Sequence, residues 1–128
     1  MPRKPSPTLT EGELRLMQVL WDKRAATAAQ VAEALPPPQP HYSSIVTILR
    51  VLEKKGFVRH REHGRAYVYE PLVDRDTAAD TAVGHVLANF FRNNPTSLAL
   101  RLVSKERLSR QEIDQLRSLI DGYEDDQA

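Results

Sequence analysis

The fold is decided by residues 41–69, HYSSIVTILRVLEKKGFVRHREHGRAYVY. Residues 41–55 predict a helix, because apolar side chains recur there every three or four positions and Gly56 follows at the expected end. At about 100° per residue, the side chains of this helix fall on two different faces. The apolar face holds Ile45, Ile48, Leu49 and Leu52, and the opposite face holds Ser43, Thr47, Arg50 and Lys54. We therefore expect one face to pack on the domain and the other to remain free.

The second half of this stretch predicts a β-hairpin. Residues 57–61 and 66–69 alternate in polarity with a period of two, and residues 62–65 join them with a glycine-containing turn. Val58 and Val68 are expected to hold the hairpin on the core. Arginine and histidine alternate along its first strand, a pattern that half-exposed sheets also show.

Two short helices are expected before this stretch. Thr10 with Glu13, and Thr27 with Gln30, have the spacing of capping boxes at helix starts. The proline-rich residues 36–40 end the second helix. Three short helices followed by a hairpin is the element order of a winged helix-turn-helix.

Charge is distributed unevenly along the 128 residues. The whole chain has 18 Lys and Arg against 17 Asp and Glu, a net charge of +1. Residues 1–72 nevertheless carry 11 basic and 7 acidic side chains, whereas residues 73–128 carry 7 and 10. Residues 41–65 alone hold six Lys and Arg against two Glu, together with three of the four histidines. This local excess on the helix and hairpin favours binding to double-stranded DNA.

The residue types in this segment predict a division of labour on DNA. Hydroxyl groups and arginine suit base edges in the major groove, whereas other cations suit phosphates. Contacts to bases are expected from Ser43, Ser44, Thr47 and Arg50. Contacts to phosphates or the minor groove are expected from Lys54, Lys55, Arg59, Arg61, His63 and Arg65. The plainer alternative is an ordinary amphipathic helix beside a half-exposed sheet.

The pattern after Pro71 is purely helical and predicts three more helices. Asn94-Pro95 begins the second of them, and a capping box of Ser109 with Glu112 begins the third. About 55 residues without a covering sheet expose more apolar surface than so small a unit can bury alone. A single intramolecular core is the alternative to a dimer. The predicted dimer interface consists of Val83, Val86, Leu87, Phe90, Leu98, Leu102, Leu116 and Ile120.

The expected fold class is therefore mainly α with a small β-hairpin wing. Residues 9–73 are expected to form a winged helix-turn-helix DNA-binding domain, and residues 74–122 a three-helix dimerisation domain. Residues 1–8 predict a disordered, basic, proline-rich tail, and residues 123–128 an acidic tail.

Several kinds of chemistry are not indicated by the sequence. The chain has no cysteine, which excludes disulfides and fits a reducing compartment. His60 and His63 lack a third clustered ligand, so no metal site is predicted. No phosphate-binding loop or nucleophile with a paired base occurs, so neither an enzyme nor a cofactor is expected. No apolar segment suggests a signal peptide or membrane insertion, and a cytoplasmic protein is expected.

Four motifs occur in a characteristic order along the chain. They are LTEGELRLMQVLW at 9–21, YSSIVTILRVLEKKGFV at 42–58, YVYEPLV at 67–73 and LSRQEIDQL at 108–116. With these motifs, about residues 8–121 resemble the penicillinase repressor (BlaI/MecI) family of winged-helix transcriptional repressors. By position, the resemblance adds Tyr42 to the residues expected to contact DNA.

The resemblance implies a homodimeric repressor that binds a pseudo-palindromic operator through its third helix and wing. In characterised members, a membrane-bound sensor metallopeptidase leads to cleavage within the dimerisation domain, which releases the DNA. Such a protease is the partner that the resemblance implies, and proteolysis or disruption of the dimerisation domain is the expected route of derepression.

This chain departs from the family pattern at two places. It has Val51 where the family usually has Arg or Lys, with Arg50 one position earlier, and Arg101-Leu102 where the penicillinase repressors have the cleaved Asn-Phe bond. The cysteine ligands of copper-responsive relatives are absent. The alternative function is a winged-helix module that binds an acidic protein without sequence-specific DNA binding.

Overall fold

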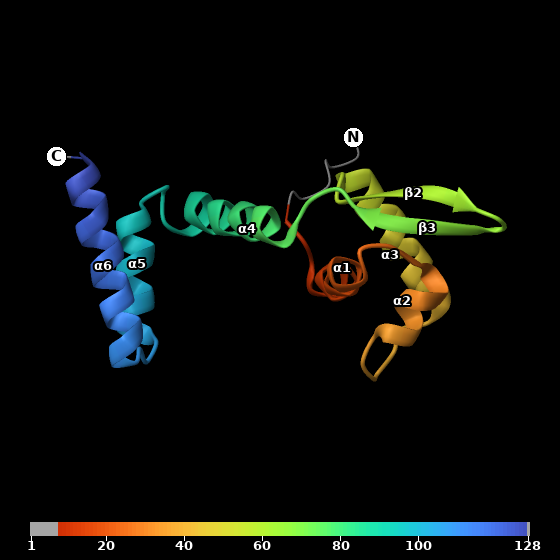
Figure 1. Ribbon diagram of the computed structural model, residues 1–128, viewed down its shortest axis with the longest axis horizontal. Helices are drawn as coiled ribbons and strands as arrows, with labels where there is room; N and C mark the ends of the chain where they lie inside the picture. The colour runs from red at the N-terminus through yellow and green to blue at the C-terminus, as the bar shows by residue number, and fades with distance from the viewer. Residues whose placement is uncertain (1–7, 128) are drawn as a thin grey trace. The chain divides into compact units, whose positions relative to one another are not determined.

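The computed structural model describes residues 8–127 of the chain, with side chains as far as Tyr123. The elements follow in the order α1 (Glu11–Lys23), β1 (Ala26–Thr27), α2 (Ala28–Ala34), α3 (Tyr42–Lys55), β2 (Val58–His63), β3 (Ala66–Pro71), α4 (Arg75–Phe90), α5 (Pro95–Lys105) and α6 (Arg110–Gln127) (Figure 1). This order confirms the expected fold class, a winged helix-turn-helix followed by three helices.

The sequence predicts a tail at each end of the chain, and the outcome differs between the two ends. The tail predicted for residues 1–8 lies, except for its last residue, outside the described part of the chain. Helix α6 continues through Gln127, so the backbone of residues 123–127 is helical where the sequence indicates an acidic tail.

Helices α1 and α2 begin at the predicted capping boxes. The Thr10 hydroxyl accepts from the Glu13 backbone N–H at 3.2 Å, and the Glu13 carboxylate accepts from the Thr10 N–H at 2.8 Å. Thr27 and Gln30 repeat the arrangement at 3.2 and 2.9 Å. These bonds satisfy backbone N–H groups that have no partner inside the helix.

The core lies where α1, α2 and α3 meet the sheet. Its fully buried side chains, at 0% exposure, are Met17, Leu20, Val31, Ile45, Leu49 and Leu52. Burying each such side chain contributes about 1.5–3 kcal/mol. The predicted apolar face of α3 is thereby confirmed, except that Ile48 is only half-buried.

The sheet has a third strand that the sequence analysis missed. Its order is β1-β3-β2, with Ala26 opposite Tyr69 in one antiparallel pair and Arg61 opposite Val68 in the other. Directly opposite residues share a face. Ala26 and Tyr69 are buried, so Val68 and Arg61 lie on the other, solvent-facing side. The expectation that Val68 holds the hairpin is therefore wrong; Tyr69 does so, together with Val58.

The described residues form two compact units that divide between Val86 and Leu87. The first unit reaches beyond the expected boundary at residue 73 because the start of α4 is tied to α1. The Trp21 indole N–H donates to the Val73 carbonyl at 2.9 Å, and the Arg75 guanidinium lies 5.3 Å from the centre of the Trp21 ring. Ala78 of α4 is buried in the same unit.

The second unit contains the end of α4 with α5 and α6. Asn94 caps α5 by accepting from the Ser97 N–H at 3.2 Å, and Ser109 and Glu112 form the predicted capping box. No side chain is buried among residues 79–123. Within residues 8–127, no helix has the length and apolarity needed to cross a membrane.

Candidate nucleic-acid interface

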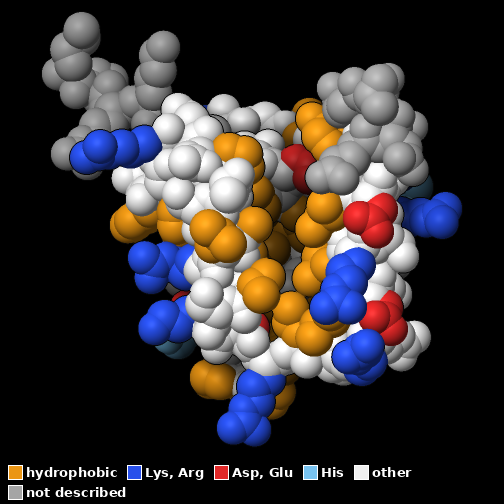
Figure 2. Space-filling view, turned by 90° about the vertical axis from the view of Figure 1, so that its left-hand side faces the viewer, with side chains coloured by type: hydrophobic (Ala, Val, Ile, Leu, Met, Phe, Trp, Pro, Cys, Tyr) orange, Lys and Arg blue, Asp and Glu red, His pale blue; other side chains and the backbone are white. Residues whose placement is uncertain are grey.

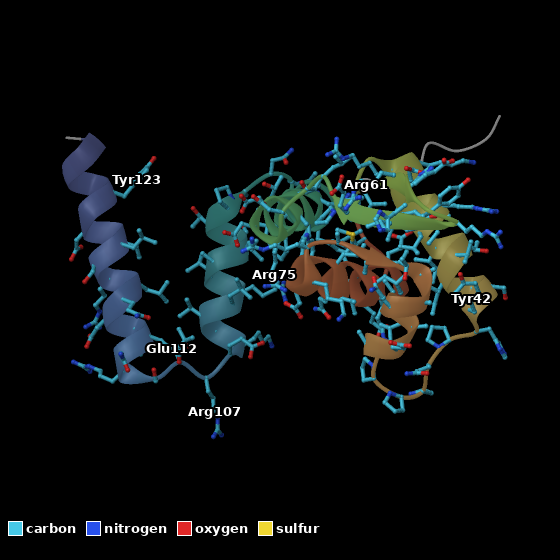
Figure 3. The ribbon with its side chains drawn as sticks, turned by 45° about the vertical axis from the view of Figure 1, so that its right-hand side comes forward. Tyr42, Arg61, Arg75, Arg107, Glu112 and Tyr123 are labelled. Carbon is cyan, nitrogen blue, oxygen red and sulfur yellow. The ribbon has the colours of Figure 1, made fainter. Side chains whose placement is uncertain are left out.

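A stripe of polar side chains runs along the exposed side of α3. We call Ser43, Thr47, Arg50 and Lys54 the outer stripe; all four are exposed and lie within about 60° of one another around the helix axis. Gly56, with φ at +86°, ends the helix in the left-handed conformation that glycine adopts without strain. Tyr42 and Ser44 are also exposed at the start of α3, where Figure 3 labels Tyr42.

Thr47 has a defined hydrogen-bonding role within the outer stripe. Its hydroxyl donates to the Ser43 backbone carbonyl at 3.0 Å. With its proton used in this way, the hydroxyl oxygen can only accept from a partner, and the methyl group remains free. Thr47 is therefore suited to a base amino group or to the thymine methyl group in a major groove.

The basic residues of the hairpin lie on its solvent-facing side. Arg59, Arg61 and His63 are exposed there, and Figure 3 labels Arg61. The Arg59 Nε atom lies 2.7 Å from a Glu70 carboxylate oxygen across the strand pair, so its charge is partly compensated. Arg65 is exposed at the turn. The hairpin thus carries the cations that the sequence predicts, with Arg59 already paired.

His60 joins the hairpin to α3. Its backbone N–H donates to the Glu53 carboxylate at 3.0 Å, and its Nδ1 atom lies 2.7 Å from the same carboxylate oxygen. The ring centre lies 4.5 Å from that of Tyr67 and 5.7 Å from that of Tyr69. His60, which the sequence suggests only as a weak metal-ligand candidate, positions the hairpin against α3. The described residues hold no cluster of three or more His, Asp or Glu side chains suited to a metal ion.

Lys55 does not belong to the exposed surface. Its Nζ atom lies 2.7 Å from a Glu13 carboxylate oxygen and donates to the Thr8 carbonyl at 3.1 Å; the two charged side chains are 5% and 8% exposed. Lys55 is about 100° from Lys54 around the helix and turns toward α1. Its ammonium group is not available to a phosphate, which removes Lys55 from the predicted DNA contacts.

The ion pair holds Glu13 in its charged form. Burial raises the pKa of Glu13, but the hydrogen bonds from Lys55 and Thr10 and the positive charge of Lys55 outweigh burial, so the pKa is lowered overall. Glu13 therefore completes the capping box and neutralises Lys55 at the same time.

A cleft of about 300 Å³ opens between α3, the start of α2 and the hairpin. Its chemically distinctive lining residues are Tyr42, Arg50, Arg65, Tyr67 and Tyr69. Burial raises the pKa of the Tyr69 hydroxyl, the Glu53 carboxylate raises it further, and the Arg50 guanidinium opposes both effects. Arg50 therefore lines this cleft as well as belonging to the outer stripe.

Residues 9–122 match the profile of the family described as penicillinase repressor. The chain belongs to the penicillinase repressor family. A penicillinase repressor from Bacillus licheniformis is 26% identical over 121 residues, which cover 94% of each chain. The methicillin resistance regulatory protein MecI of Staphylococcus aureus (strain N315) is 27% identical over 114 residues, covering 88% of this chain and 92% of the relative.

Two solved structures share the fold of this penicillinase repressor family member. The solution structure of the DNA binding domain of the repressor BlaI has a TM-score of 0.50 and 29% identity, and covers 60% of this chain and 93% of that chain. The crystal structure of a possible transcriptional regulator for arsenical resistance has a TM-score of 0.50 and 27% identity, covering 77% and 91%. The family consists of transcriptional repressors, not enzymes.

The residues predicted to form a dimer interface lie on α4, α5 and α6. Leu87 and Leu98 are half-buried, and the others are exposed in the single chain. Phe90 is 78% exposed and Ile120 58%. Leu119 of α6, which is not among the predicted residues, is 72% exposed. Figure 2 looks onto the end of the chain with α5 and α6 and shows many hydrophobic side chains at the surface.

Proposed function

We propose that this penicillinase repressor family member is a cytoplasmic homodimer that binds a pseudo-palindromic operator and blocks transcription. The observation that carries the proposal is the outer stripe of α3, which offers hydroxyl groups and cations while the opposite face is locked in the core. The similar BlaI structure is that of a DNA binding domain, and the similar MecI is described as a regulatory protein.

In this proposal, α3 of each protomer lies in a major groove. Ser43, Ser44 and Thr47 contact base edges, and Tyr42 contacts the DNA where α3 begins. Phosphate or minor-groove contacts come from Lys54, Arg59, Arg61, His63 and Arg65. Phosphate contacts supply affinity and register, whereas base contacts supply sequence preference.

Dimerisation places two copies of α3 about 34 Å apart, one helical turn of DNA. Support for it comes from the exposed apolar side chains of α4, α5 and α6, which water contacts in the single chain. Binding of one half-site then makes the second half-site contact intramolecular, which raises affinity without new kinds of contact.

Release from DNA follows, in this proposal, from damage to the dimerising helices. Cleavage in this region, brought about by a membrane-bound sensor metallopeptidase, would separate the two half-site contacts. Arg101-Leu102, both exposed in the middle of α5, occupies the position of the bond that the family resemblance implicates. Operator affinity should fall when the dimer dissociates, whatever the cause of dissociation.

Selection of duplexes from a random pool by the purified full chain tests the proposal. The expected result is an enriched inverted repeat whose half-sites are about 10 base pairs apart, centre to centre, and whose binding weakens steeply with salt. If no sequence is enriched over random competitor, the chain is not an operator-binding repressor, and an acidic protein partner becomes the better explanation.

Replacing Thr47 by Val is expected to weaken binding at particular base pairs. Valine keeps the shape and the methyl group but removes the accepting hydroxyl, so we expect a loss of about 1–3 kcal/mol confined to one or two positions of the half-site. The matched control is Lys54→Ala, which should weaken all sequences equally. Binding titrations with single-base operator variants measure the affinity of both protein variants. An equal loss of affinity for all sequences in Thr47→Val would contradict the role assigned to Thr47.

A further inference from the structure

The cleft between α3 and the hairpin has walls that are cationic and aromatic. Tyr42 and Arg50 line it from α3, and Arg65 and Tyr67 line it from the turn and the start of β3. Its volume of about 300 Å³ is far above the roughly 10–15 Å³ that one water molecule requires. The cleft is thus large enough to hold a polyatomic group.

The guanidinium groups of the two cleft arginines have no direct partner. Among residues 8–123, no side-chain hydrogen bond or ion pair involves Arg50 or Arg65, whereas the Arg59 guanidinium is paired with Glu70. None of the lining residues is acidic. Two guanidinium groups on the walls of one cleft repel each other, and an anion held between them removes that repulsion.

Arg50 occupies the edge of the outer stripe that faces the hairpin. Around the helix axis it lies about 40° from Val46, and both residues line the cleft. Thr47 lies about 60° from Arg50 on the other side, away from the cleft. Position around the axis of α3 therefore separates Thr47, which faces outward, from Arg50, which borders the space between helix and hairpin.

The chemistry of DNA identifies the anion. With a helix in the major groove and a hairpin reaching toward the neighbouring minor groove, the strand that separates the two grooves passes between helix and hairpin. This strand presents phosphodiester groups, whose two free oxygens match the paired N–H donors of arginine.

We propose that Arg50 and Arg65 clasp one phosphodiester group of the bound DNA from opposite sides, with the hydroxyl groups of Tyr42 and Tyr67 beside it. The proposal rests on the proposed function and assigns Arg50 a role different from the base contact that the sequence suggests. In this role Arg50 fixes the register of α3 in its groove, and Arg65 fixes the hairpin against the same strand.

Arg50→Ala and Arg65→Ala test the clasp in the full chain, and Arg61→Ala serves as a comparison that removes a different proposed DNA contact. Arg61 is an exposed arginine of the same hairpin and does not line the cleft. Both cleft variants should weaken binding to operator and to random duplex by the same factor, about tenfold, and lower the slope of log affinity against log salt by about one. Thermal unfolding should be unchanged, because both side chains are exposed.

Operators that carry a single uncharged methylphosphonate linkage locate the clasped phosphate. At one position per half-site, the uncharged linkage should weaken wild-type binding about tenfold. At the same position it should not change the affinity of Arg50→Ala or Arg65→Ala, whereas the affinity of Arg61→Ala should still fall about tenfold. If Arg50→Ala changes base preference and leaves random-duplex affinity intact, or if the two variants respond to different linkages, the clasp is wrong.

Failure of the clasp and failure of the proposed function give different results. A wild-type protein that prefers no sequence contradicts the operator-binding function, but the affinity of the Arg50→Ala/Arg65→Ala double variant for random duplex still decides the clasp. A double variant that binds no more weakly than either single variant supports it, and losses that add overturn it. A wild-type protein that selects an operator while the cleft variants bind normally keeps the function and removes the clasp.

Discussion

Replacing Phe90 by Asp is expected to convert the protein to a monomer and to lower operator affinity by about 10²- to 10⁴-fold. Phe90 lies at the end of α4 and is 78% exposed, so the single chain gains little from its ring. An aspartate at this position would have to lose its hydration inside an apolar contact between protomers, which is costly without a partner charge. The variant chain itself should fold, because the new carboxylate is exposed in the monomer.

Ala88→Asp is the matched control for this prediction. It adds the same charge one turn or less away, on an exposed position about 160° around α4 from Phe90. Sedimentation velocity should give a monomer for Phe90→Asp and a dimer for Ala88→Asp, and the thermal midpoint of the wild type should rise with concentration. A Phe90→Asp protein that sediments as a dimer and binds operator normally would place the interface elsewhere. Leu87 is a poorer target because it is half-buried within its own unit.

Helix starts were predictable from the sequence because capping is a local interaction. Thr10 with Glu13 and Ser109 with Glu112 stand three positions apart, and the hydrogen bonds within each capping box involve no other element. The two faces of α3 were predictable for the same reason, since helical periodicity alone separates Leu49 from Thr47.

The sheet was harder to predict because its order depends on pairing between distant segments. Strand β1 has two residues, too few for any periodicity, and exists only through its pairing with β3. In the run Tyr67-Val68-Tyr69, all three side chains are apolar enough to be buried. Alternation along the strand therefore cannot decide whether Val68 or the two tyrosines face the core. Pairing of Tyr69 with Ala26 decides which phase faces the core.

The candidate site also has one part that could be predicted from the sequence and one part that could not. The outer stripe belongs to one helix and follows from its sequence. The cleft does not, because Arg50 and Arg65 come together only when the hairpin packs against α3. Lys54 and Lys55 look equivalent in sequence, and the difference between them comes from a carboxylate 42 residues away from Lys55.

Replacing Lys55 by Met is expected to lower the free energy of unfolding by about 3–5 kcal/mol. The loss arises because the carboxylate of Glu13 would remain buried without its cation, and an uncompensated buried charge is strongly destabilising. Lys54→Met, on the neighbouring exposed residue, should change the free energy by about 0.5 kcal/mol or less. Urea unfolding of the three proteins measures the difference, and equal effects at both lysines would contradict the pairing.

The pH dependence of stability provides an independent check on the same ion pair. The folded-state pKa of Glu13 is lowered from its ordinary value of 4.5, so its contribution is complete above that pH and is lost as the pH falls through the lowered pKa. In Lys55→Met, the hydrogen bond and charge of the lysine no longer lower the pKa of Glu13, whereas burial and the Thr10 hydrogen bonds still act. The stability that ionised Glu13 contributes above pH 4.5 should therefore be smaller in Lys55→Met than in the wild type. Adding Glu13→Leu to Lys55→Met removes the unpaired charge and should restore much of the lost stability. A double variant no more stable than Lys55→Met would mean that lost packing, not an unpaired carboxylate, is the cause.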